Sequence, residues 1–142
     1  MGEMTMGNIM MRLGAAINDH DLDAFVALFA ADYQSDQPAH PMRAFRGAEK
    51  VRENWSSVFA GVRDLKAELL ASATTGDGME LGEWYWHGTH LDESPFAMGG
   101  VIVLGVRGEE IIWGRLYMEP VEQEGTDIDE MVRETYRPPE AR

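Results

Sequence analysis

The hydrophobic pattern of this chain changes its period at Gly61, and that change limits the folds that the chain can adopt. Before Gly61, apolar residues recur at helical spacing, as between Ile9 and Ile17, which predicts amphipathic helices with one face turned to a core. After Gly61, apolar and polar residues alternate over residues 65–71, as in a strand with one buried face. A helical half followed by a strand half predicts an α+β fold.

The helical half contains three predicted helices. The first runs from Ile9 to Ile17, the second is capped by Asn18 or Asp19 and continues through Leu22 to Phe29, and the third follows Gly47. Residues 35–41, with the sequence SDQPAHP, separate the second helix from the third. Proline lacks the N–H that a helix needs and restricts the residue before it, so this segment is predicted to be a stiff loop.

The strand half reads as an antiparallel meander with a helical tail. The strand over residues 65–71 is followed by predicted strands at 79–90, 96–106 and 111–119. Turn residues at 74–78 separate the first strand from the second, and those at 107–110 separate the third from the fourth. The sequence TDID at 126–129 fits a capping box before an amphipathic stretch. We therefore expect a single domain over residues 1–142, with a core at about 9–120 and a C-terminal helix at about 126–136.

Composition excludes several functional classes. The 142 residues include 12 Lys and Arg against 25 Asp and Glu, and the formal net charge of -13 opposes binding to nucleic acid and to anionic membrane surfaces. The chain has no cysteine, which excludes disulfides, thiolate zinc sites and a cysteine nucleophile. No run approaches the ~20 apolar residues of a membrane span, and the N-terminus lacks a basic leader. We expect a cytoplasmic protein without a membrane partner.

Several segments together resemble one protein family. They are DLDAFVALFA (21–30), FRGAEKVRENW (45–55), the GTH element after Trp86, PFAM (95–98) and IIWGRLYMEP (111–120). The pattern resembles the SnoaL-like branch of the nuclear transport factor 2-like superfamily, whose members include polyketide cyclases, ketosteroid isomerases, limonene-epoxide hydrolases and binding proteins. The resemblance implies a cone-shaped, curved antiparallel or mixed β-sheet around three N-terminal helices, and a homodimer through the outer sheet face.

The resemblance also implies a pocket with one or two carboxylates and no cofactor. An apolar cavity disfavours the charged form of a carboxylate and so raises its pKa towards neutrality, where it can exchange protons. Asp36 is the best candidate by position, with His40 beside it in the proline-stiffened segment. The alternatives are a turn-forming aspartate and a solvated loop histidine.

The strand over residues 79–90 offers a second candidate set. Glu83, Tyr85 and His87 alternate along one face, and Trp84 and Trp86 lie on the other. If the first face looks inward, its three residues supply an acid or base, a hydrogen-bond donor and an orienting group. If it looks outward, they form a solvated or dimer-interface stripe and the tryptophans line the pocket. Alternation separates the two sets without deciding between them.

The last strand departs from the family pattern. Leu116 and Arg115 occupy positions where epoxide-hydrolase-like and cyclase-like members carry an acid. Arg115 is predicted either to anchor a substrate anion or to pair with an acid such as Glu119 or Glu83. The predicted ligand-binding residues are Trp55, His87, Met98, Arg115, Leu116 and Met118.

No metal site is predicted. His87 and His90 are three residues apart, so on a strand they point to opposite faces.

Two functions remain open at this level. The first is a cofactor-independent cyclase, isomerase or hydrolase acting on a small hydrophobic metabolite with a carbonyl or epoxide group, through Asp36, Glu83, Tyr85 and His40. The second is a non-catalytic module of the same fold that binds a ligand or forms a dimeric interface.

Overall fold

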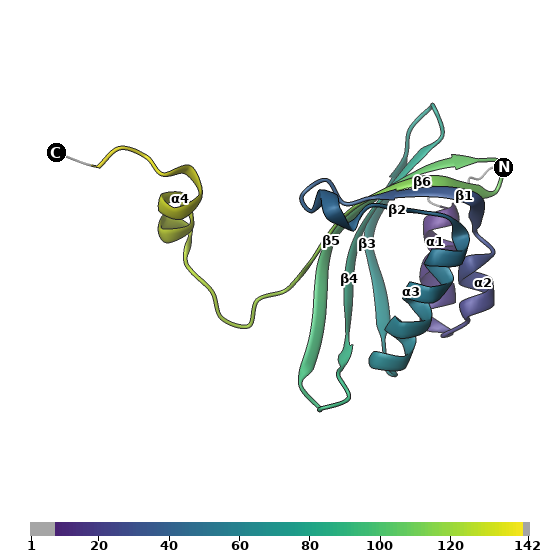
Figure 1. Ribbon diagram of the computed structural model, residues 1–142, viewed down its shortest axis with the longest axis horizontal. Coiled ribbons are helices and arrows are strands. Elements are labelled where there is room, and N and C mark those ends of the chain that lie inside the picture. The colour runs from purple at the N-terminus through teal and green to yellow at the C-terminus, as the bar shows by residue number, and fades with distance from the viewer. Residues whose placement is uncertain (1–7, 141–142) are drawn as a thin grey trace.

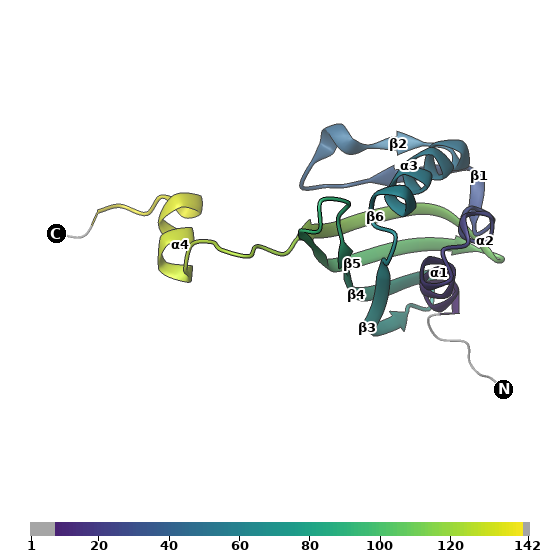
Figure 2. The same ribbon diagram turned by 90° about the horizontal axis from the view of Figure 1, so that it is seen from below.

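The computed structural model describes residues 8–140 and has an α+β fold. A curved six-stranded sheet carries three helices against its concave side (Figures 1 and 2). The strand order is β2-β1-β6-β5-β4-β3. The elements are α1 (Asn8–Asn18), α2 (Leu22–Val26), β1 (Phe29–Asp36), the 3-10 helix η1 (Pro41–Arg43), β2 (Phe45–Arg46), α3 (Ala48–Gly61), β3 (Lys66–Thr74), β4 (Met79–Thr89), β5 (Pro95–Arg107), β6 (Glu110–Pro120) and α4 (Ile128–Tyr136).

The four predicted strands of the meander are confirmed as β3, β4, β5 and β6. Each pairs antiparallel with the next, and the register places Glu83 beside Val101 and Val101 beside Tyr117. The parallel pair in the sheet is β1 with β6, so the sheet is mixed. The predicted first and third helices are confirmed as α1 and α3.

The predicted second helix is wrong beyond Val26. The helix ends there, and Phe29 begins β1, which pairs with β2 and β6. Residues 35–41 are accordingly not all loop, because Ser35 and Asp36 are the last residues of that strand. The apolar run at 25–29 fits both a helix and a strand, and tertiary pairing decides: the amide of Ile111 in β6 donates to the carbonyl oxygen of Leu28 at 2.8 Å.

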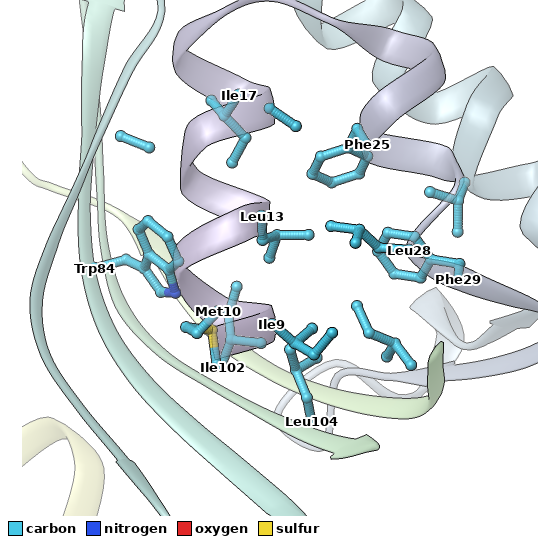
Figure 3. Close-up of a cluster of buried hydrophobic side chains, with 14 of the residues drawn as sticks. Ile9, Met10, Leu13, Ile17, Phe25, Leu28, Phe29, Trp84, Ile102 and Leu104 are labelled. Carbon is cyan, nitrogen blue, oxygen red and sulfur yellow. The ribbon is translucent and has the colours of Figure 1, made fainter. Parts of the chain in front are cut away.

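Helix α1 packs directly on the inward face of β4, where it forms much of the core (Figure 3). A Cβ atom at Gly82 would lie 2.6 Å from Cγ of Met10, and a Cβ atom at Gly14 would lie 2.9 Å from the Trp84 ring. Both glycines therefore leave space that a large partner side chain fills. Trp84 is only 1% exposed as a result.

Two polar side chains hold the ends of α1. Glu80 of β4 is 6% exposed, and its carboxylate accepts hydrogen bonds from the backbone amides of Ile9 (3.2 Å) and Met10 (2.9 Å). At the other end, the Asn18 amide bonds to both backbone groups of Ala67 on the edge strand β3, at 3.0 and 2.7 Å. The first contact satisfies amides that a helix leaves unpaired and places negative charge at the positive end of its dipole.

Helix α4 stands apart from the rest of the fold at the end of an extended segment (Figures 1 and 2). The predicted C-terminal helix is confirmed as α4. Its N-cap is Asp127, whose side chain accepts a hydrogen bond from the Glu130 backbone amide at 3.0 Å. Ile128 and Tyr136 on this helix are exposed. Within residues 8–140, no helix combines the length and the apolar character that a membrane crossing requires.

The Glu80 contact gives a stability prediction. Replacing Glu80 by Ala leaves two buried amides without an acceptor, so we expect the free energy of unfolding to fall by about 2–3 kcal/mol. Glu80→Gln keeps one acceptor oxygen and should cost less. Glu83→Ala, on the outward face of the same strand, should change stability by no more than about 0.5 kcal/mol. Urea denaturation measures all three, and equal losses for Glu80→Ala and Glu83→Ala would contradict the capping role.

Candidate functional site

A cavity of about 250 Å³ lies between the helices and the concave face of the sheet. Its walls are mainly apolar and come from nearly every element of the fold except β3 and α4. The apolar lining consists of Leu13 from α1, Phe25 from α2, Phe29 from β1, Phe45 from β2, Val51, Trp55 and Val58 from α3, Trp86 from β4, Met98, Ile102 and Leu104 from β5, and Leu116 and Met118 from β6.

Aromatic rings form one wall of this cavity. The Trp55 ring lies 4.3 Å from the Phe25 ring and 5.5 Å from the Trp86 ring, measured between centroids. The Trp55 and Trp86 planes meet at 75°, an edge-to-face geometry that aromatic pairs favour. The packing holds Trp55 in place and leaves the cavity with a preformed aromatic surface.

Four polar side chains besides Tyr33 also contribute to the lining. They are Ser35 at the end of β1, Gln37 and Arg43 in the segment that leads to β2, and Asn54 on α3. Ser35 is 2% exposed, and Nη1 of Arg43 donates to Oε1 of Gln37 at 3.1 Å. We refer to these four residues as the polar mouth, since Arg43 is exposed and Gln37 and Asn54 are partly exposed, whereas Ser35 is buried. Among the described residues that line the cavity, none carries a carboxylate.

Tyr33 adds a buried hydroxyl to the lining. Burial raises its pKa above the ordinary value of 10.0, a hydrogen bond with Ser35 acts in the opposite direction, and the negative charge of Asp36 raises the pKa further. A Cβ atom at Gly114 would lie 2.5 Å from the Tyr33 hydroxyl oxygen, so the glycine makes room for the phenol. At neutral pH Tyr33 is therefore a neutral hydrogen-bond donor.

Four of the residues predicted to bind a ligand line the cavity: Trp55, Met98, Leu116 and Met118. Their role in binding stays a prediction. The other two do not line it. Arg115 lies over the outer-face Trp113 ring at 4.5 Å from its centroid, and His87 bonds through Nε2 to the Glu68 carboxylate at 2.7 Å.

The predicted acid and imidazole of residues 35–41 lie beside the cavity and not in its lining. Asp36 follows the inward Ser35 and so belongs to the opposite face of β1, where its carboxylate accepts from the Gln34 amide at 3.4 Å. Nε2 of His40 bonds to the Glu119 carboxylate at 2.7 Å. This pair joins the loop after β1 to the end of β6.

The structure also answers which face of β4 looks inward. Trp84 and Trp86 are buried, whereas Glu83 is exposed and Tyr85 is 37% exposed. Tyr85 stacks on His87 with ring centroids 5.1 Å apart. The acid, phenol and imidazole therefore form a stripe on the outer face, and the structure does not bring them together with the cavity.

The outer face also exposes Tyr117, which is 42% exposed on β6. A homodimer through this face stays a prediction.

Sequence analysis missed the residues of the polar mouth and Tyr33. The available signal was the short alternation at the end of β1, where the buried Tyr33 and Ser35 alternate with the partly exposed Gln34 and Asp36. The alternation is too short to predict a strand between a helix and a proline-rich segment, and Gln37, Arg43 and Asn54 lie outside it. Within residues 8–140, no group of three or more His, Asp or Glu side chains is placed to hold a metal ion.

Comparison with solved structures places this geometry in a known fold. IdmH from Streptomyces antibioticus, a proposed polyketide cyclase, superposes with a TM-score of 0.69 at 22% identity, over 80% of this chain and 91% of that one. A hypothetical protein from Catenulispora acidiphila with a ketosteroid isomerase-like fold, solved with trimethylamine, gives a TM-score of 0.65 at 24% identity, over 75% and 82%. At these identities the likeness establishes the fold.

A search of curated proteins found no match. A family model described as a SnoaL-like domain matches residues 11–113. This match covers most of the chain and agrees with the six-stranded curved sheet and its three packed helices. The chain belongs to the SnoaL-like domain family.

Proposed function

We propose that this protein binds a small, mainly apolar metabolite in the cavity between α3 and the concave face of the sheet. The observation that carries the proposal is the lining itself: a preformed, mainly apolar and aromatic wall with a few polar groups. This is the usual composition of a small-molecule site, in which apolar area supplies affinity and a few polar groups set orientation.

The size of the cavity restricts the ligand. Sites for drug-sized molecules commonly measure about 300–1,000 Å³, and this cavity, at about 250 Å³, is smaller. A ligand of one or two rings fits this space better than a four-ring molecule. Stacking against Trp55 favours an aromatic or conjugated ring.

The polar groups of the lining favour binding over carboxylate chemistry. Tyr33, Arg43 and Asn54 all supply hydrogen-bond donors, and donors bind and polarise a carbonyl oxygen. Proton abstraction needs a base, and Asp36 and Glu83 lie outside the lining.

A cofactor-independent cyclase or isomerase is the second candidate. It is supported by the polyketide cyclase named among the fold relatives.

Blocking the cavity tests the binding proposal. Leu116→Trp places a larger side chain into the cavity, and Tyr117→Trp introduces the same indole on the outer face of the same strand. We expect Leu116→Trp to weaken binding of small aromatic ketones at least tenfold, or about 1.4 kcal/mol, with no change for Tyr117→Trp. Isothermal titration calorimetry measures the affinities, and circular dichroism confirms folding. Equal effects of the two variants, or no ketone binding by the unmodified protein, would refute the proposal.

Removing the two predicted carboxylates separates binding from acid/base catalysis. Asp36→Asn and Glu83→Gln should each leave the affinity for aromatic ketones within about twofold of the unmodified protein, or roughly 0.4 kcal/mol. The reason is that neither side chain lines the cavity. Proton exchange at the carbon next to the ketone, followed by NMR in deuterated water, should be equally unaffected. Loss of exchange in either variant would instead support the enzyme.

The buried phenol predicts a distinct titration. Of the four tyrosines, Tyr33 should ionise at the highest pH, because burial raises its pKa. In the unfolded chain the same group loses its proton near pH 10, so the folded state retains more protons and its stability falls as pH rises above that value. Tyrosinate absorbance and urea denaturation measure the two effects. Tyr33→Phe should remove the late-titrating group and lessen the loss of stability; an unchanged titration curve would contradict the assignment.

A further inference from the structure

The cavity lining carries a positive charge, whereas the chain as a whole is negatively charged. Acidic residues outnumber basic ones by 25 to 12 in the whole sequence. The described lining nevertheless contains one charged side chain, and it is the cation Arg43. Because acids are the commoner charged residues in this chain, a single charged residue in the lining would more often be an acid. A cation at this position therefore favours a ligand that is itself negatively charged.

The backbone around Arg43 is held by several contacts. The His40 amide donates to the Gln37 carbonyl at 2.7 Å, and the Arg43 amide donates to the His40 carbonyl at 2.9 Å. The His40 side chain ties this loop to Glu119 at the end of β6. Directly after it, Phe45 pairs with Ser35 in the sheet. These contacts fix the backbone of the segment, and so the position of the Arg43 Cα atom relative to the cavity.

The neighbouring groups leave N–H donors of Arg43 and Gln37 available to a ligand. Arginine has five N–H donors, of which one is used by the Gln37 side-chain oxygen at 3.1 Å. That bond leaves the Gln37 amide nitrogen as a donor of its own. The nearby carboxylates have other partners, since Asp36 accepts from Gln34 and Glu119 pairs with His40.

We propose that the ligand of this cavity carries a carboxylate, bound at the polar mouth by Arg43 with the side-chain amides of Gln37 and Asn54. The ligand class is thus an aromatic or conjugated carboxylic acid of one or two rings, with its ring on the Trp55 side. This inference rests on the proposed function, because it assumes that the cavity is the binding site.

Local contact outweighs the overall negative charge in this arrangement. At physiological ionic strength charges are screened over about 8 Å, so the acids elsewhere on the surface act weakly on a bound anion. Arginine binds carboxylates through two parallel hydrogen bonds, which are stronger than bonds between neutral groups. A neutral amide of the same shape cannot form that pair.

A matched pair of ligands and a matched pair of variants test the inference. Naphthoate and naphthamide differ in charge and little in shape. Arg43→Gln and Arg46→Gln each remove one positive charge, but Arg46 does not line this cavity. Dissociation constants come from tryptophan fluorescence at constant ionic strength.

We expect the unmodified protein to prefer naphthoate at least tenfold. The preference should fall to about twofold or less in Arg43→Gln and persist in Arg46→Gln, in keeping with about 1.4 kcal/mol per tenfold change. Equal binding of both ligands by the unmodified protein, or a preference that survives Arg43→Gln, would overturn the carboxylate assignment while leaving the cavity as the binding site. Failure of naphthoate, naphthamide and the aromatic ketones alike would overturn the proposed function itself.

Discussion

The packing of α1 on β4 decides which face of the sheet is inside. Met10 fills the space above Gly82, Gly14 lies against Trp84, and the Glu80 carboxylate binds the first turn of the helix. Because side chains alternate along a strand, fixing these positions also fixes the rest of β4. The indole of Trp86 is thereby directed to the cavity, and the strand's acid, phenol and imidazole are directed outward.

The same strand extends from a filled region of the interior to the cavity. Trp84 lies beneath α1, where the glycines allow close approach and the core is filled. Trp86 lies further along β4, opposite α3, where its ring meets Trp55 edge to face. The cavity lies beside these two rings.

Local periodicity was sufficient to predict α1, α3 and the four strands of the meander, because each has a long stretch with one clear period. It was insufficient for β1, whose first residues follow a short apolar helix and whose strand conformation depends on pairing with β6, more than 75 residues away (Phe29 beside Ile111). The Glu80 contact joins residues 70 and 71 positions apart. Trp55 and Leu116 were predicted to meet a ligand and do line the cavity, whereas the polar mouth combines the end of β1 with the segment after it and with α3, which local periodicity cannot bring together.

A shift of one residue in β1 would change the chemistry of the cavity. The pairing of β1 with β6 is irregular between Phe29 and Gln34, after which Ser35 lies beside Gly114 and Asp36 beside Arg115. This register turns the Ser35 hydroxyl inward and the Asp36 carboxylate outward. Since a one-residue slip reverses the faces of a strand, the irregularity determines whether the cavity presents an acid or a hydroxyl. With the hydroxyl inside and Arg43 nearby, the cavity is suited to receive a negative group rather than to supply one.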